Sequence, residues 1–141
     1  MSEDQATNNI EGHGSRVRVY FGESDKRQGK ALWYALLDFL RREGASGATV
    51  SRGVAGFGAH SVIHTAHLVD ISPDLPLVLE WVDADERVDA LLPRLAEMIG
   101  GGLITRDPVQ ILHYRPHADR VGPSPSSRQE DDRRPQGAPT E

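Results

Sequence analysis

Three glycines and one phenylalanine stand close together where a loop with exposed backbone amides would be expected. Gly53, Gly56 and Gly58 fall within six positions, and Phe57 separates the last two. Glycine permits positive φ and lets other groups approach the backbone closely. Amides exposed in this way can accept an anion. The same spacing is also typical of a hairpin or bulge in which Phe57 fills the core, and the glycine spacing alone favours this second interpretation. The rest of the chain must decide between the two.

Three histidines follow at a spacing that could bind a metal. His60, His64 and His67 would share one face of a helix, since positions i, i+4 and i+7 lie above one another. Imidazole suits zinc, copper or nickel, but no carboxylate or cysteine lies within this span. We therefore predict no metal site and keep metal handling by the triplet as an alternative. The favoured interpretation is a polar loop that contacts a partner or ligand and responds to pH.

No motif of a catalytic class accompanies these residues. The sequence has no nucleophile elbow, no Walker loop and no zinc motif. The absence of cysteine also excludes disulfides and thiolate chemistry. Asp83 and Glu86 have the spacing of a capping box, which indicates a helix start rather than an acid–base pair. We expect a protein that is not an enzyme.

The two ends of the 141-residue chain differ from its middle in composition. Residues 1–14 and 117–141 hold almost no large apolar side chains, so we expect disordered tails. The residues between them, 15–116, suffice for one domain. Residues 16–115 carry a net charge of −1, so the tails hold most of the formal charge of −5. Without a basic stripe we predict no nucleic-acid partner.

Nothing in the sequence predicts a membrane segment or an exported protein. No apolar run approaches the roughly 18 residues that a membrane helix needs. The first residues are polar and acidic, unlike a signal peptide. We therefore expect a cytoplasmic protein.

The helices that would position the glycine loops are predicted from their apolar stripes. Leucines and a phenylalanine at helical spacing predict a helix from Lys30 to Arg42, which Gly44 ends with a left-handed cap. Lys30 would then lie in its first turn. A second stripe predicts a helix that begins at Asp83, is kinked at Pro93 and stops at the glycines 100–102.

The strands are predicted from alternation and from apolar runs. They lie at residues 16–21, 48–54, 77–82 and 109–114, the last one after a break at Pro108. With the two helices this order predicts an α+β fold of the ferredoxin-like βαββαβ type, a four-stranded antiparallel sheet with both helices on one face. We expect Arg52 and Glu80 to pair across the second and third strands.

The other face of such a sheet lacks a cover within one chain. The strand at 77–82 is apolar on both sides. We therefore infer that part of this second face is buried, most simply by self-association.

At this point the motifs resemble those of the nitrogen-regulatory PII signalling proteins. The resemblance rests on Gly44-Ala-Ser-Gly-Ala-Thr-Val, then Gly56-Phe57-Gly58, then His64-Thr65. It is closer still to the PII-like family called domain of unknown function 190, and it spans residues 16–114. The motifs shared with that family are Gly22-Glu-Ser-Asp, Gly29-Lys30, the segment from Gly47 to Gly58, Asp74-Leu-Pro and Gly102-Leu-Ile-Thr.

The resemblance implies a homotrimer that binds small molecules in clefts between subunits. An adenine nucleotide is the ligand it suggests, with its phosphates held by the two glycine loops. Ala59-His60 stands where PII proteins have Arg-Gln, which leaves a different or less charged anion open. The ligand-binding positions it implies are Thr49, Gly56, Phe57, Gly58, Ala59, His60, Gly100, Gly101 and Gly102.

The resemblance also implies how a bound ligand would be signalled. The segment after Gly58, with His60, His64 and His67, corresponds to the mobile loop by which PII proteins contact partners. A membrane transporter or channel is the kind of partner it suggests. Besides this sensor hypothesis and metal handling, a third alternative is an interaction module in which the segment is a rigid packing loop.

Overall fold

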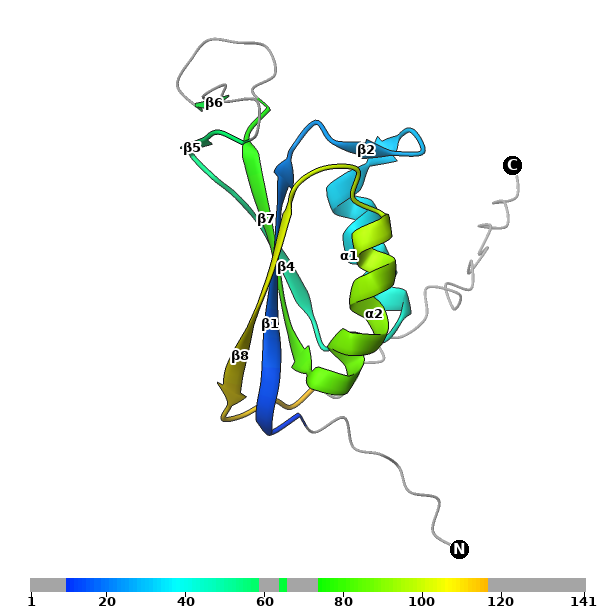
Figure 1. Ribbon diagram of the computed structural model, residues 1–141, viewed down its shortest axis with the longest axis vertical. Helices are drawn as coiled ribbons and strands as arrows, with labels where there is room; N and C mark the ends of the chain where they lie inside the picture. Colours follow the sequence, from blue (N-terminus) through cyan, green and yellow to red (C-terminus); the bar gives the residue numbers. More distant parts are fainter. Residues whose placement is uncertain (1–9, 59–63, 66–73, 117–141) are drawn as a thin grey trace, which may run out of the picture.

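The computed structural model describes residues 10–58, 64–65 and 74–116, and all structural statements below concern this part of the chain (Figure 1). Its main sheet is antiparallel, with the strand order β4-β7-β1-β8. The bounds of these strands are Gly12–Gly22 for β1, Ala48–Arg52 for β4, Pro76–Ala84 for β7 and Leu103–Ile111 for β8.

Two helices cover one face of this sheet. They are α1 (Leu32–Arg42) and α2 (Asp85–Glu97), and they lie side by side to the right of the four strands in Figure 1. This arrangement confirms the predicted ferredoxin-like α+β fold. Two short pairs of strands complete the described structure: β2 (Lys26–Arg27) with β3 (Lys30–Ala31), and β5 (Ala55–Gly56) with β6 (His64–Thr65).

The core lies between the helices and the sheet. Alternate residues of the central strands β1 and β7 point towards the helices, because successive side chains of a strand face opposite ways. The apolar stripes of the helices meet them, as their spacing predicts. The side chains in this core with almost no exposed surface are Val17, Val19, Leu79, Trp81, Leu36, Leu40, Val88 and Leu95.

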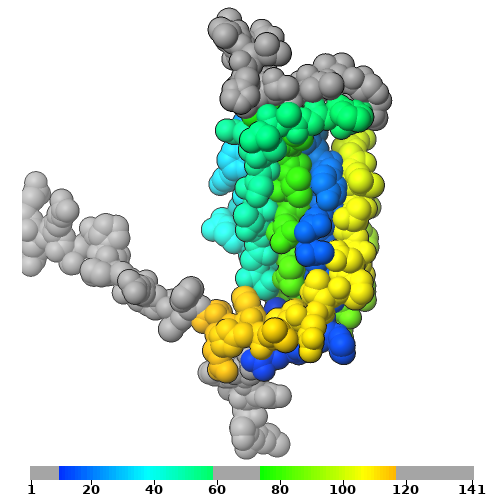
Figure 2. All heavy atoms as spheres, turned by 90° about the vertical axis from the view of Figure 1, so that its left-hand side faces the viewer, coloured from blue at the N-terminus to red at the C-terminus, as the bar shows by residue number. Residues whose placement is uncertain are grey.

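Most of the opposite face of the sheet has no cover within the described residues, and the segment after β8 crosses only one end of it towards β4 (Figure 2). Cross-strand register places the side chains of this open face in rows. One row holds Ser51, Val78, Tyr20 and Leu103, and the next holds Thr49, Glu80, Arg18 and Thr105. Apolar and charged side chains therefore share the open face.

The start of α2 differs from the prediction. The helix begins at Asp85, and Ala84 rather than Asp83 is its N-cap, without a side-chain capping bond. Asp83 is instead the last inward-facing residue of β7 and has no exposed surface. Its carboxylate accepts hydrogen bonds from the indole N–H of Trp81 and the backbone N–H of Ser46, both at 2.9 Å. The predicted capping box was wrong because Asp83 belongs to β7 and its carboxylate accepts these hydrogen bonds inside the core.

The first helix also begins later than predicted. It starts at Leu32, because Lys30 and Ala31 form β3 and pair with β2. Lys30 therefore lies in a short hairpin and not in the first turn of a helix. The end of α1 agrees with the prediction, since Gly44 has the left-handed φ of 77° expected after a helix.

The predicted last strand and the predicted tail boundary also need correction. Strand β8 runs without a break through Pro108, which an edge strand tolerates because one side of its backbone needs no partner. Strand β1 begins at Gly12, four residues earlier than predicted, so residues 12–14 belong to the sheet and not to a tail. The remaining tail residues, 1–9 and 117–141, lie outside the described part of the chain.

Two further expectations concern single side chains. Helix α2 continues through Pro93 to Glu97. The predicted Arg52–Glu80 pair is wrong, because the register places Arg52 opposite Leu77. Arg52 pairs with Glu23 instead, and Glu80 pairs with Arg18.

Among the described residues no helix is both long and apolar enough to cross a bilayer.

Candidate functional site

The loop after β4 owes two of its glycines to close packing. A Cβ atom at Gly53 would lie 2.8 Å from Cγ of Pro76, and one at Gly56 would lie 3.0 Å from the same atom. The backbone N–H of Gly53 also donates to the carbonyl of Pro76 at 2.7 Å. None of the three glycines in this loop has a positive φ. The role of Gly53 and Gly56 in the fold is therefore the close approach of β7 and not an unusual backbone conformation.

Phe57 and Gly58 behave differently from the glycines before them. The Phe57 side chain is 70 % exposed, so the interpretation in which it fills the core is wrong. A Cβ atom at Gly58 would meet nothing within 4 Å. The loop thus presents an aromatic ring and adjoining backbone to solvent. Its base is the short pairing of β5 with β6, in which Gly56 lies opposite His64.

One turn after β1 anchors both sides of this loop. The carboxylate of Glu23 forms an ion pair with Arg52, the last residue of β4. The backbone N–H of Glu23 donates to the carbonyl of Leu75 at 2.9 Å. The next N–H, of Ser24, donates to the carboxylate of Asp74 at 2.8 Å. The Gly22-Glu-Ser-Asp and Asp74-Leu-Pro motifs are therefore neighbours in space and hold the loop at one end of the sheet.

The second glycine loop joins α2 to β8. Gly102 has φ of 142°, and a Cβ atom there would lie 2.5 Å from the carbonyl oxygen of Tyr20. Any side chain at this position would clash with β1. Gly100 and Gly101 have open space around them instead. The backbone is exposed at these two positions, and no packing contact there requires a glycine.

The two glycine loops lie at the same end of the sheet but at opposite edges. The row Ser51, Val78, Tyr20 and Leu103 joins the end of β4 to the start of β8 across the whole sheet. Three spacings between strands separate its outer members, about 14 Å. Both loops extend from this row at the end where β5 lies (Figure 1). One copy of the chain therefore does not bring the two loops together.

Thr49 lies away from both loops, on the open face of β4. It is exposed and stands opposite Glu80, whose carboxylate accepts a hydrogen bond from Arg18 at 2.9 Å. That bond raises the pKa of Arg18 above its ordinary value, so the guanidinium keeps its charge. Thr49 is three residues from the end of β4, about 10 Å along the strand.

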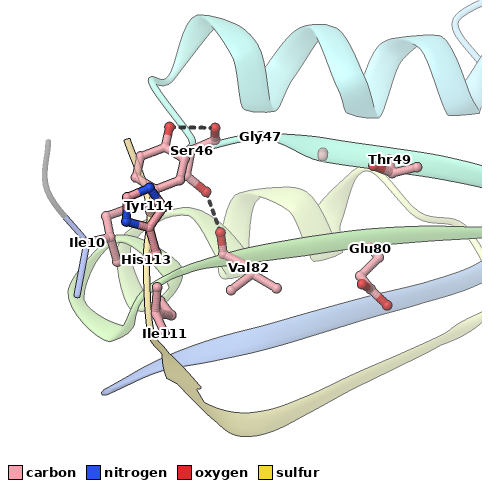
Figure 3. A pocket seen from close by; sticks show the side chains of 10 residues that line it. Ile10, Ser46, Gly47, Thr49, Glu80, Val82, Ile111, His113 and Tyr114 are labelled. Atoms are coloured by element: carbon pink, nitrogen blue, oxygen red, sulfur yellow. Dashed lines mark hydrogen bonds between the residues drawn. The ribbon is translucent and has the colours of Figure 1, made fainter. Parts of the chain in front are cut away.

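Thr49 and Glu80 line a hollow of about 420 Å³ at the other end of the sheet (Figure 3). The segment after β8 closes one side of it with His113 and Tyr114. The Tyr114 hydroxyl donates to the carbonyl of Ser46 at 2.8 Å, which holds this segment beside the start of β4. This hollow could not be predicted from the sequence, because no periodic pattern indicates that residues after the last strand fold back.

The histidine triplet falls largely outside the described residues, as does Ala59. His60 and His67 are not described, and His64 lies in the strand β6. The described residues contain no group of three His, Cys, Asp or Glu side chains placed to hold a metal ion. The metal-handling alternative needs the three histidines on one face of a helix, but His64 lies in a strand.

Comparison with known families and sequences gives consistent matches. The family DUF190, described as an uncharacterized ACR, matches residues 14–111. The UPF0166 protein MJ1524 of Methanocaldococcus jannaschii is 37% identical over 89 residues, which cover 62% of this chain and 82% of that protein. A UPF0166 protein of Aquifex aeolicus is 32% identical over 100 residues, covering 69% of this chain and 91% of that protein.

A solved structure resembles the fold. It is a putative PII-like signaling protein, TTHA0516, from Thermus thermophilus, with a TM-score of 0.54. The match covers 73% of this chain and 94% of that chain, at 19% sequence identity. At this identity the likeness concerns the fold.

Proposed function

The chain belongs to DUF190, a family of PII-like proteins, and from this membership we propose that it is a regulatory protein that senses a small anionic ligand. The ligand would be a nucleotide or a related anion, with an adenine nucleotide as the first candidate. It would bind between copies of the chain and alter how the segment after Gly58 contacts a partner protein. The proposal includes no catalytic activity of its own.

The observation that carries this proposal is the placement of the two glycine loops. Gly56–Gly58 follow one edge strand and Gly100–Gly102 precede the other, at the same end of the sheet. When three or more copies associate head to tail around a rotation axis, one edge of a copy faces the opposite edge of the next. The two loops would then meet across the interface, and backbone amides from two chains would surround one anion.

Self-association is supported by the open face of the sheet. Tyr20 is 36 % exposed there and Leu103 is 56 % exposed, although both belong to regular strands. A second copy on this face would remove these side chains from water. We propose the homotrimer that the resemblance to PII proteins implies, since three copies close a ring of such contacts.

The remaining predicted ligand-binding positions differ in how close they lie to the exposed loop amides. Phe57 and Gly58 are exposed beside the loop amides and would contact the ligand directly. Thr49 lies about 10 Å from the end of β4, so it would contact only the part of an extended ligand that is remote from the phosphates. Ala59 and His60 remain proposals that follow from their position in the chain after Gly58. A membrane transporter or channel likewise remains the proposed kind of partner.

A thermal-shift experiment with matched variants tests this function. Adenine nucleotides and cyclic nucleotides would be added to the full chain, to Gly58→Trp and to Gly101→Trp. Both substitutions place a side chain in open space, so the fold should persist while the site is blocked. Ala90→Trp, on the exposed side of α2, controls for added bulk.

We expect at least one nucleotide to raise the melting temperature of the unaltered chain and of Ala90→Trp. The two glycine variants should show little or no rise. If no ligand shifts the unaltered chain, or if all four proteins shift equally, the proposed site is wrong.

A further inference from the structure

The hairpin β2–β3 concentrates positive charge that has no carboxylate partner among the described residues. Its residues Lys26, Arg27 and Lys30 include both lysines of the whole chain. None of the three forms an ion pair with a described carboxylate, and Arg27 contacts only the carbonyl of Glu97, at 3.5 Å. The register even places Arg27 directly opposite Lys30. Like charges in that position destabilise a strand pair, so the fold itself gains nothing from them.

The other basic side chains of the described residues differ from those of the hairpin, because most of them have carboxylate partners. Nearly all of them lie within ion-pair distance of an aspartate or glutamate, and the exception outside the hairpin is Arg115 near the end of the described chain. Those with partners are Arg16, Arg18, Arg41, Arg42, Arg52, Arg87, Arg94 and Arg106. In an acidic chain of net charge −5, unpaired cations gathered on one hairpin are a local departure from the general pattern.

Two aromatic side chains adjoin this hairpin. Strand β3 runs directly into α1, and the first turn of that helix exposes Trp33 by 38 % and Tyr34 by 55 %. Their rings meet edge to face with centroids 5.9 Å apart. Exposed tryptophan and tyrosine supply much of the binding energy where proteins associate, and charges around them select the partner. We call the residues Lys26, Arg27, Lys30, Trp33 and Tyr34 the hairpin patch.

The patch lies where a regulated partner could reach it. The hairpin stands on the helix side of the molecule, away from the open sheet face through which copies would associate (Figure 1). It also lies at the end of the sheet that carries the loop after β4. The turn that precedes it, with Glu23 and Ser24, holds both sides of that loop. A protein bound at the patch would therefore stand close to the loop.

We propose that the hairpin patch is a docking surface for an acidic segment of a partner protein. Carboxylates of that segment would pair with the lysines, and its apolar atoms would pack on Trp33 and Tyr34. Three cations on a chain of net negative charge are too few for nucleic acid or an anionic membrane, which need extended basic surfaces. The proposal does not depend on the ligand site between the glycine loops.

The test uses a labelled peptide of alternating glutamate and aspartate as the probe. Its binding to the full chain would be followed by fluorescence anisotropy at low salt and at about 0.15 M salt. Lys26→Gln with Lys30→Gln removes two charges from the patch. Arg41→Gln with Arg42→Gln removes two charges from the other end of α1 and is the matched control. Trp33→Ala is compared with Leu112→Ala, which truncates an apolar side chain exposed at the far end of the sheet.

We expect the lysine variant to bind about tenfold more weakly and the arginine control to change by less than about twofold. Trp33→Ala should weaken binding about fivefold, whereas Leu112→Ala should not. Circular dichroism would verify that each variant is folded. Absence of binding by the unaltered chain, or equal losses in both charge variants, would overturn the proposal. Tighter binding of duplex DNA or phosphatidylglycerol vesicles than of the peptide, abolished by the lysine variant, would also overturn it.

Discussion

Among the three glycines after α2, Gly102 occupies a position that no side chain can fill without moving β1. Its φ of 142° and the 2.5 Å approach of the Tyr20 carbonyl both oppose a Cβ atom. We predict that Gly102→Ala lowers the free energy of unfolding by about 1–3 kcal/mol. Gly100→Ala, in open space, should change it by less than about 0.5 kcal/mol. Urea unfolding of the two variants measures the difference, and equal effects would contradict this assignment.

The buried carboxylate of Asp83 ties three parts of the chain together. It accepts hydrogen bonds from Trp81 in the core, from Ser46 before β4 and from the backbone N–H of Ala84 before α2. Asp83→Ala would leave these donors without an acceptor, and we predict a loss of about 3 kcal/mol in unfolding free energy. Asp89→Ala breaks an exposed ion pair with Arg106 and should cost less than about 1 kcal/mol. A similar small loss in both variants would refute the structural role of Asp83.

At the scale of whole elements, apolar periodicity predicted most of the fold. The helical stripe of Leu32, Leu36 and Leu40 is buried as its spacing indicates. The central place of β7 also follows from its apolar run. Periodicity reports which face of an element is buried, and the core imposes that requirement on every residue along it.

Element boundaries and individual polar contacts could not be predicted in the same way. Asp83 has the spacing of a cap, but its carboxylate faces indole and backbone donors that only the folded chain brings near. The partner of Arg52 depends on register, which places Leu77 rather than Glu80 opposite it. The hollow beside Tyr114 depends on a long-range bond to Ser46. Each of these features needs distances between residues far apart in the sequence.

Helix α2 offers an element-scale prediction because it contains Pro93. The proline lies well inside Asp85–Glu97, where its missing N–H leaves a backbone carbonyl without its helical donor. We predict that Pro93→Ala raises the free energy of unfolding by about 1–3 kcal/mol. Pro108→Ala, in the edge strand β8, should change it by less than about 1 kcal/mol. Urea titration of both variants provides the comparison, and a destabilised Pro93→Ala protein would disprove this expectation.

At the scale of the whole molecule, the proposed assembly would bury the open sheet face. The Arg18–Glu80 pair lies in the middle of that face and would become buried in the proposed assembly. Glu80→Gln would leave the Arg18 charge unpaired there, so we predict that assembly weakens by at least about tenfold. Glu43→Gln breaks an exposed pair with Arg94 on the helix side and should leave assembly unchanged. Analytical ultracentrifugation over a dilution series measures both, and a monomeric unaltered chain would contradict the proposed assembly.

In the proposed assembly, one ligand site takes the loop after β4 from one copy and the loop before β8 from the next. Co-expression of Gly58→Trp chains with Gly101→Trp chains tests it directly, because each variant alone would block every site. In randomly mixed assemblies about a quarter of the interfaces should combine two unaltered loops, since each loop is intact in half of the chains. We expect nucleotide binding, absent from either variant alone, to return to about that fraction in the mixture. No recovery in mixed assemblies, or full binding by either variant alone, would contradict it.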